Sequence, residues 1–156
     1  MTATPPNRVV ASRQFSATVA EVYEAWTEPE IMRHWLTPGP NIIVHVETNA
    51  VVGGALLIRS QSPDGTIHVI NGMYRELMPG QRIAMTWTYT GPFELICGME
   101  TLIEIDLRAD GPERTKMVFT QSRFTSREAA DAYEGDWPSC FDKLSAVLAM
   151  PSGQKQ

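Results

Sequence analysis

The sequence predicts an α+β helix-grip fold, in which a curved antiparallel sheet of about six to seven strands wraps around one long C-terminal helix. Between residues 41 and 124, apolar residues recur with a period of two, which is typical of strands. Helical periods flank this region, in two short segments before it and one longer segment after it. Strands and helices therefore occupy separate parts of the chain, which argues against a parallel sheet built from alternating strands and helices.

The first part of the chain predicts one strand and two short helices. Residues 8–15 are rich in β-branched and aromatic side chains and form the predicted strand. Each helix then begins with a T-x-x-E capping box, the first at Thr18 and the second at Thr27. Pro29 suits the first turn of the second helix, and Pro38 ends it.

The middle of the chain predicts the rest of the sheet. Its strands are expected at residues 42–49, 55–60, 66–77, 81–89, 99–108 and 115–124. Gly53-Gly54, the Ser-Pro-Asp-Gly segment 62–65 and two further Pro-Gly or Gly-Pro turns separate these strands. Because the connections are short, consecutive strands should be antiparallel neighbours.

The last part of the chain predicts a helix with a break. A third capping box is expected from Thr125 to Glu128. Gly135 and Pro138 disfavour a continuous helix, so we expect a short leading helix, a break near Gly135 and a main helix over residues 137–149. The apolar stripe expected to pack on the sheet consists of Trp137, Cys140, Phe141, Leu144, Val147 and Leu148.

Length and composition indicate the class of protein. The 156 residues suit a single helix-grip domain over 1–156, with loose tails at 1–7 and 151–156. The net charge of -5, without a basic run, argues against a nucleic-acid partner. Neither a secretory signal nor a membrane-spanning apolar run is visible, so we expect a cytoplasmic protein that does not insert into membranes. Cys97 and Cys140 should then be reduced, with a disulfide between them the less favoured alternative.

Several short motifs occur in the same order as in a known family. They are Arg13-Gln14-Phe15, the A-W-T-E-P-E segment 25–30, Trp35, Pro38, Gly53-Gly54, the P-D-G segment 63–65, Gly72, Tyr74, Glu76, Pro79, Thr86-Trp87 and the D-W-P-S-C-F-D-K-L segment 136–144. On these residues the chain resembles the activator of Hsp90 ATPase homologue 1-like family (AHSA1-like), within the START/Bet v 1-like (SRPBCC) superfamily. The resemblance implies a helix-grip fold and often a cavity for a small apolar molecule. It implies no single activity, because fold does not fix function.

The sequence departs from the family pattern at three polar positions. Asn49 and Val51 stand where the family often has an Asp and an Arg before the double glycine, and Gln121 stands where it often has a His. Any role that the family gives to those side chains is therefore not carried over to this chain.

Strand alternation gives a candidate ligand site between the sheet and the last helix. Alternate residues of the predicted strands are aromatic or methionine, and soft methionine side chains can adapt to varied apolar ligands. A filled core would produce the same stripes. The candidate ligand-binding residues are Met73, Met85, Trp87, Tyr89, Met99, Met117, Phe119, Gln121, Trp137 and Phe141.

The residues that carry reactive chemistry form no motif. His34 is expected to pair with Glu30 on a helix surface, and His45 and His68 to be exposed, satisfied in the core or at a cavity wall. Cys140 should pack as a small hydrophobe. We therefore assign no catalytic residue, metal ligand or cofactor.

The first hypothesis on function is binding of a small, mostly apolar molecule by a monomer or homodimer. The alternatives are a cyclase- or hydrolase-type enzyme that uses the same cavity, and a surface-acting, co-chaperone-like interaction protein.

Overall fold

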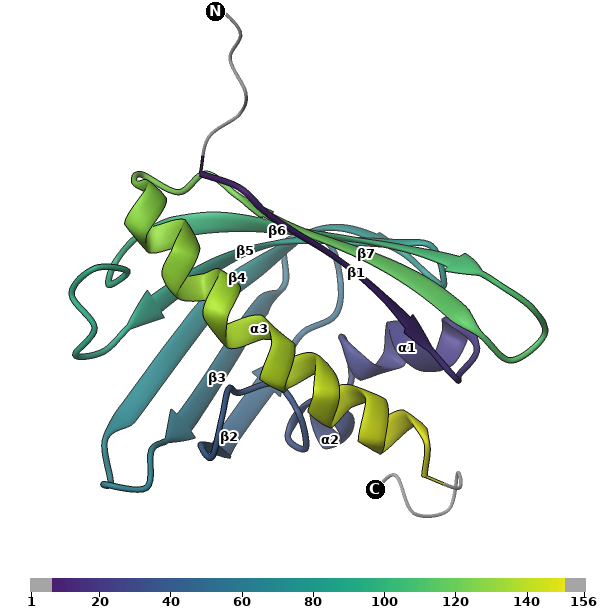
Figure 1. The fold of residues 1–156 in the computed structure, drawn as a ribbon, viewed down its shortest axis with the longest axis horizontal. Helices are drawn as coiled ribbons and strands as arrows, with labels where there is room; N and C mark the ends of the chain where they lie inside the picture. Colours follow the sequence, from purple (N-terminus) through teal and green to yellow (C-terminus); the bar gives the residue numbers. More distant parts are fainter. Residues whose placement is uncertain (1–6, 151–156) are drawn as a thin grey trace, which may run out of the picture.

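A computed structural model describes residues 7–150 and contains one seven-stranded antiparallel sheet, with a long helix lying across its concave face (Figure 1). The strands are β1 (Val9–Phe15), β2 (Ile42–Thr48), β3 (Ala55–Gln61), β4 (Ile67–Met78), β5 (Arg82–Thr90), β6 (Glu100–Ala109) and β7 (Thr115–Ser122). Their order across the sheet is β1-β7-β6-β5-β4-β3-β2. The helices are α1 (Val19–Ala25), α2 (Pro29–Met32) and α3 (Arg127–Leu148). The predicted helix-grip fold is confirmed, while the predicted tails lie outside the described residues except for Asn7.

On β5, β6 and β7 the concave face of the sheet is the face that strand alternation predicted, whereas on β4 the prediction for Met73 is wrong, because Met73 alternates with buried Tyr74 and is 45% exposed. Ile83, Ile105 and Phe119 are aligned across β5, β6 and β7 by the strand register, and all three are fully buried. Neighbouring rows on the same face carry Met85 and Met117, which are equally buried. Each buried row faces α3, and the stripe from Trp137 to Leu148 is buried against it, as the helical spacing predicted.

Helices α1 and α2 confirm one predicted cap and contradict the other. The Glu21 backbone donates to the Thr18 hydroxyl over 3.2 Å, and the Thr18 backbone donates to the Glu21 carboxylate over 2.9 Å. The capping box predicted at Thr27 is wrong, because the Thr27 hydroxyl donates to the carbonyl of Tyr23, 3.2 Å away in the preceding helix. Helix α2 therefore starts after Glu28 without a side-chain cap.

Helix α3 is continuous, so the predicted break near Gly135 is wrong. Its N-cap is Ser126, whose hydroxyl accepts from the Ala129 backbone over 3.1 Å, and the capping box predicted at Thr125 is also wrong. An internal proline costs a helix roughly 3 kcal/mol. The helix nevertheless passes through Pro138, since nine of its side chains are buried and a broken helix would expose part of them.

Two tryptophans that follow the short helices, Trp26 after α1 and Trp35 after α2, fill one half of the space between the sheet and α3. Trp26 and Trp35 are fully buried, and their ring centroids lie 4.7 Å apart. The Trp26 ring also lies 6.2 Å from Phe119 on β7 and 6.1 Å from Trp137 on α3. This aromatic cluster leaves the opposite half of the space, toward β3 and β4, to hold any cavity.

Candidate functional site

A cavity of about 80 Å³ lies between α3 and the half of the sheet formed by β3, β4 and β5. The segment after α2 and the loop after β5 complete its wall. The lining residues from the strands are Ile58, Ser60, His68, Ile70, Trp87 and Tyr89. Those from α3 are Tyr133, Asp136, Trp137 and Cys140, and those from the two connecting segments are Leu36, Thr37, Pro38, Asn41, Phe93 and Ile96.

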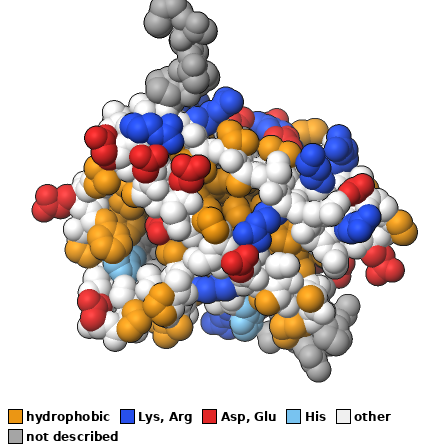
Figure 2. Space-filling view, viewed as in Figure 1, with side chains coloured by type: hydrophobic (Ala, Val, Ile, Leu, Met, Phe, Trp, Pro, Cys, Tyr) orange, Lys and Arg blue, Asp and Glu red, His pale blue; other side chains and the backbone are white. Residues whose placement is uncertain are grey.

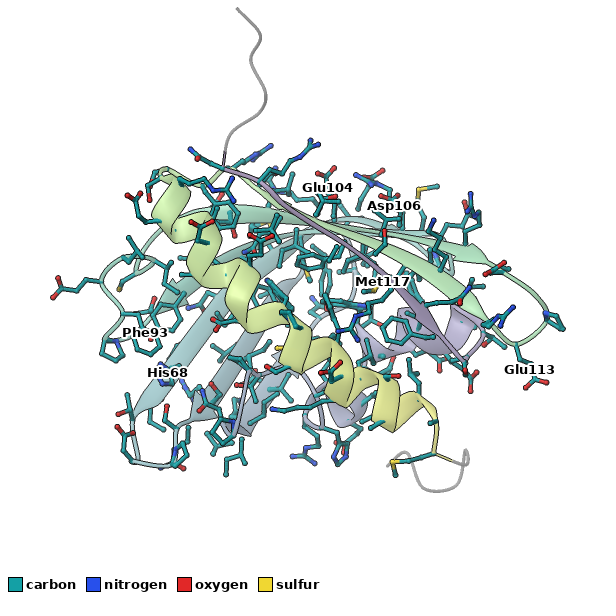
Figure 3. The ribbon with its side chains drawn as sticks, viewed as in Figure 1. His68, Phe93, Glu104, Asp106, Glu113 and Met117 are labelled. Carbon is teal, nitrogen blue, oxygen red and sulfur yellow. The ribbon has the colours of Figure 1, made fainter. Side chains whose placement is uncertain are left out.

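Aromatic rings form much of the cavity wall. The ring of Trp87 on β5 packs against that of Trp137 on α3, with centroids 5.5 Å apart and the ring planes tilted by 51°. At the outer end, the Phe93 ring stacks on Tyr89 at 5.7 Å and on His68 at 5.1 Å. Phe93 is 58% exposed and lies next to His68 at the open side of the sheet (Figure 3). Figure 2 shows hydrophobic side chains gathered on this side of the molecule, with a histidine beside them. Phe93 therefore forms the outer edge of the cavity.

A short hydrogen-bonded chain links the cavity wall to the β3–β4 hairpin. His68 is only 5% exposed, and its Nδ1 lies 2.6 Å from the Tyr89 hydroxyl. Its Nε2 lies 2.6 Å from the hydroxyl of half-buried Ser62. Which partner donates in each of these two contacts depends on which ring nitrogen carries a proton. Burial raises the pKa of Tyr89, which keeps its phenol protonated at neutral pH.

Three further polar groups come from the helix side of the cavity. Burial raises the pKa of the Asp136 carboxyl and that of the Tyr133 phenol. The hydroxyl oxygens of Tyr133 and Thr37 are buried and have no hydrogen-bond partner. Buried polar atoms without partners are uncommon in folded proteins and call for an explanation.

The ten residues predicted to bind a ligand divide between this cavity and the filled core. Trp87, Tyr89 and Trp137 line the cavity. Five others are buried among core side chains instead: Met85, Met117, Phe119, Gln121 and Phe141. Met99 is partly buried against the core, and Met73 is 45% exposed. The structure thus brings together three of the predicted residues at the cavity and places the other seven elsewhere.

Gln121 illustrates why a core position can look like a ligand site in sequence. Its side-chain oxygen accepts from the Trp137 indole over 2.9 Å, and its nitrogen donates to the Thr101 hydroxyl over 2.9 Å. Thr101 in turn donates to the Trp87 carbonyl over 2.8 Å. The amide is therefore satisfied by the protein itself and holds the Trp137 ring in place at the edge of the cavity.

Sequence reasoning missed the lining residues Ile70, Tyr133 and Asp136, and for His68 it left a cavity wall as one of three alternatives. His68 and Ile70 share the parity of buried Tyr74 on β4, so alternation along that strand could have placed them inward. Tyr133 lies one helical turn before Trp137, and Asp136 one turn before Cys140. Because a break was expected at Gly135, the first turns of α3 were not included in the predicted buried face. Neither Tyr133 nor Asp136 was therefore predicted to line the cavity.

The remaining candidate groups lie away from the cavity or are inert. Glu30 pairs with Arg33 over 3.1 Å, not with the exposed His34 as predicted. His45 is exposed beside Glu47. Within residues 7–150, no three His, Cys, Asp or Glu side chains gather in a way that could hold a metal ion.

The two cysteines are free and lie in different environments. Cys97 is exposed, whereas Cys140 is buried on the inner face of α3, as its helical position predicted. Burial raises the pKa of the Cys140 thiol to about 12, despite the opposing effect of Lys143. A thiol that stays protonated is a poor nucleophile, so Cys140 contributes bulk to the cavity wall and no reactivity.

Comparison with known proteins identifies the family. The family model described as "Activator of Hsp90 ATPase homolog 1-like protein" matches residues 16–149. The chain belongs to this family. The match spans α1 to the end of α3 and includes every residue that lines the cavity. No curated protein matches the sequence.

Solved structures of similar proteins have the same fold. A protein from Chromobacterium violaceum is 26% identical, with a TM-score of 0.79 over 93% of this chain and 99% of its own. The AHSA1 protein from Silicibacter pomeroyi is 16% identical, with a TM-score of 0.78 over 91% and 97% of the two chains. A protein from Arthrobacter aurescens is 20% identical, with a TM-score of 0.78 over 97% and 91%. The likeness of this chain to the two structures that are 16% and 20% identical shows the fold alone.

No helix within residues 7–150 combines the length and the apolar character needed to span a bilayer.

Proposed function

We propose that this family member binds a small, mostly apolar molecule in the cavity between α3 and strands β3–β5. The observation that carries the proposal is a void of about 80 Å³ whose wall combines aromatic rings with a few polar groups. Ligand sites in proteins commonly have this composition, because apolar contacts supply affinity and a few polar groups fix orientation. In the other half of the core, by contrast, the Trp26 ring lies against Phe119 and Trp137.

The cavity volume sets the size of the occupant. A single water needs roughly 10–15 Å³ on a comparable measure, so 80 Å³ admits several waters. An engineered cavity of about 150 Å³ binds benzene. A ring-sized ligand therefore requires some widening here, and the more than half-exposed Phe93 ring is the wall element with the most freedom to move aside.

A titration followed by NMR tests the proposal. Toluene and p-cresol, added to protein labelled with ¹⁵N, should shift the indole signals of Trp87 and Trp137 before those of Trp26 and Trp35. The first pair lines the cavity, whereas the second pair lies in the filled half. Native mass spectrometry of the protein purified from its own host would then identify the natural occupant.

A matched pair of substitutions on β4 locates the binding. Ile70 lines the cavity, while its neighbour Val69 points to the opposite face of the sheet. Ile70→Trp should fill the void and abolish the shifts, and Val69→Trp should leave them unchanged. The proposal is wrong if neither compound shifts any indole signal at millimolar concentration, or if Ile70→Trp binds as well as Val69→Trp.

A second candidate function, an acid–base enzyme that uses the same cavity, is favoured by the buried His68–Tyr89 pair. A phenol held 2.6 Å from an imidazole can exchange its proton through that ring, and Ser62 extends the path toward solvent. The test is deuterium exchange at the carbon next to the carbonyl of cyclopentanone in D₂O. An enzyme of this kind should accelerate the exchange, and Tyr89→Phe should remove the acceleration. A wild-type rate equal to that of buffer would reject this candidate.

A further inference from the structure

Two hydroxyl groups at the cavity lack the hydrogen bonds that buried hydroxyls normally make. Tyr133 on α3 and Thr37 on the segment before β2 both line the cavity, and each is at least nine-tenths buried. Neither hydroxyl oxygen has a partner within the protein. Leaving such groups unsatisfied costs stability, which favours an occupant that supplies the missing partner.

The charge around these hydroxyls limits what the partner can be. None of the lining residues is a lysine or an arginine. Lys143 does not line the cavity, and its ammonium donates to the Thr37 carbonyl over 2.6 Å. The one carboxylic acid among the lining residues is Asp136, whose carboxylate form would repel an anion. A buried carboxylate or phosphate on a ligand would find no counter-ion there, and burying an unpaired charge is costly.

The aromatic walls limit the shape of the occupant. Trp87 and Trp137 flank one end of the cavity, and Phe93 and Tyr89 stack at the other. Flat rings offer the largest contact with such walls, in stacked or edge-on arrangements. Tyr133 and Thr37 also line the cavity. A polar group on the edge of a ligand ring could therefore reach one of their hydroxyls while the ligand ring contacts the aromatic side chains.

We infer that the cavity takes a small, neutral ring compound that carries a hydroxyl or carbonyl oxygen, which pairs with Tyr133 or Thr37, and that it discriminates against organic acids. This inference rests on the proposed binding function and adds the chemical class of the ligand. Protonated Tyr133 can donate to a carbonyl or share a hydrogen bond with a hydroxyl, and Thr37 can do the same. The hydroxyl that pairs with the ligand would then gain the partner that the protein itself does not supply.

Three compounds built on one ring test the inference. Toluene, p-cresol and p-toluate share the methyl-substituted ring and differ only in having no polar group, a hydroxyl or a carboxylate. Their affinities can be measured at pH 7.5 by NMR titration. We expect p-cresol to bind at least about fivefold more tightly than toluene, which corresponds to one net hydrogen bond. We expect p-toluate to bind more weakly than toluene.

Substitutions at the two hydroxyls identify the partner. Tyr133→Phe or Thr37→Val should reduce the advantage of p-cresol over toluene, and should leave the affinity for toluene within about twofold. Tyr23→Phe on α1 is the matched control, because Tyr23 does not line the cavity and its loss should leave all three affinities unchanged.

The outcomes separate this inference from the function on which it rests. Equal affinities for toluene and p-cresol, or tighter binding of p-toluate, would overturn the inference while binding itself stands. The same conclusion follows if the p-cresol advantage survives in both Tyr133→Phe and Thr37→Val. Absence of binding by all three compounds would refute the proposed function, and the inference with it.

Discussion

Removing the Tyr133 hydroxyl should stabilise the ligand-free protein, which is an unusual result for a buried tyrosine. The hydroxyl is buried without a partner, and an unsatisfied buried polar group costs about 1–3 kcal/mol. Tyr133→Phe deletes that group and keeps the ring, which packs 5.5 Å from Phe124. The free energy of unfolding should therefore rise by about 1 kcal/mol or more, and the melting temperature by about 2–4 °C for each kcal/mol in a chain of this size.

Tyr74 supplies a matched control for this prediction. It is also fully buried, but its hydroxyl donates to the Trp26 carbonyl over 3.2 Å. Tyr74→Phe breaks this bond and leaves a buried carbonyl unsatisfied, so it should lower the free energy of unfolding by about 1–2 kcal/mol. The same atom is deleted in both variants, yet the two changes should have opposite signs in urea unfolding of ligand-free protein. If Tyr133→Phe loses stability as Tyr74→Phe does, then the Tyr133 hydroxyl has a partner in solution, and the argument for a ligand that satisfies it fails.

Three other measurements test the packing and the electrostatics. Phe141→Ala should cost about 3–5 kcal/mol in denaturant unfolding, because Phe141 is 1% exposed in the filled half of the core, and a loss below about 1 kcal/mol would contradict that burial. In the native protein a thiol reagent should label the exposed Cys97 quickly and the buried Cys140 slowly, whereas equal fast labelling would show that α3 opens readily. Because partial desolvation raises the pKa of Asp136, its ionisation opposes folding, and this penalty develops as pH rises from the ordinary pKa of an aspartate to the raised one. Asp136→Asn should thus be more stable than wild type at pH 7 and equal to it below pH of about 3, and a constant difference across that range would show that charge is not the cause.

The sequence was sufficient to predict the sheet and the burial of α3, because those features follow from local periodicity. The alternation of Met117 and Phe119 on β7, for example, requires only that one face of the strand be buried. The break near Gly135 was a wrong prediction for a physical reason. Helix propensity at Gly135 and Pro138 is a local quantity, whereas the burial of Trp137, Phe141 and Leu144 against the sheet is a tertiary one that outweighs it.

The cavity was harder to predict because its position depends on what fills the rest of the fold. Strand alternation identifies the side chains that point inward. It does not show which of them contact other side chains and which line a cavity. Trp26 and Trp35 decide this, and they reach the sheet from α1 and the end of α2. Nothing in the spacing of Met117 or Phe119 shows that a tryptophan from another segment will lie against them.

One half of the core is filled by aromatic side chains and the other half contains the cavity. Stability and ligand binding should therefore be separable by substitution. In the half toward β7, aromatic rings from α1, α3 and the sheet are in mutual contact, so substitutions there remove packing and lower stability. In the half toward β3 and β4, Ile70, His68 and Tyr133 face a space that the protein itself does not fill. Substitutions there can change what enters the cavity at little cost to folding, and at Tyr133 with a gain. A set of variants in which binding and stability change independently would support this division, whereas a fixed proportion between the two effects would show that the cavity is only a packing defect of one common core.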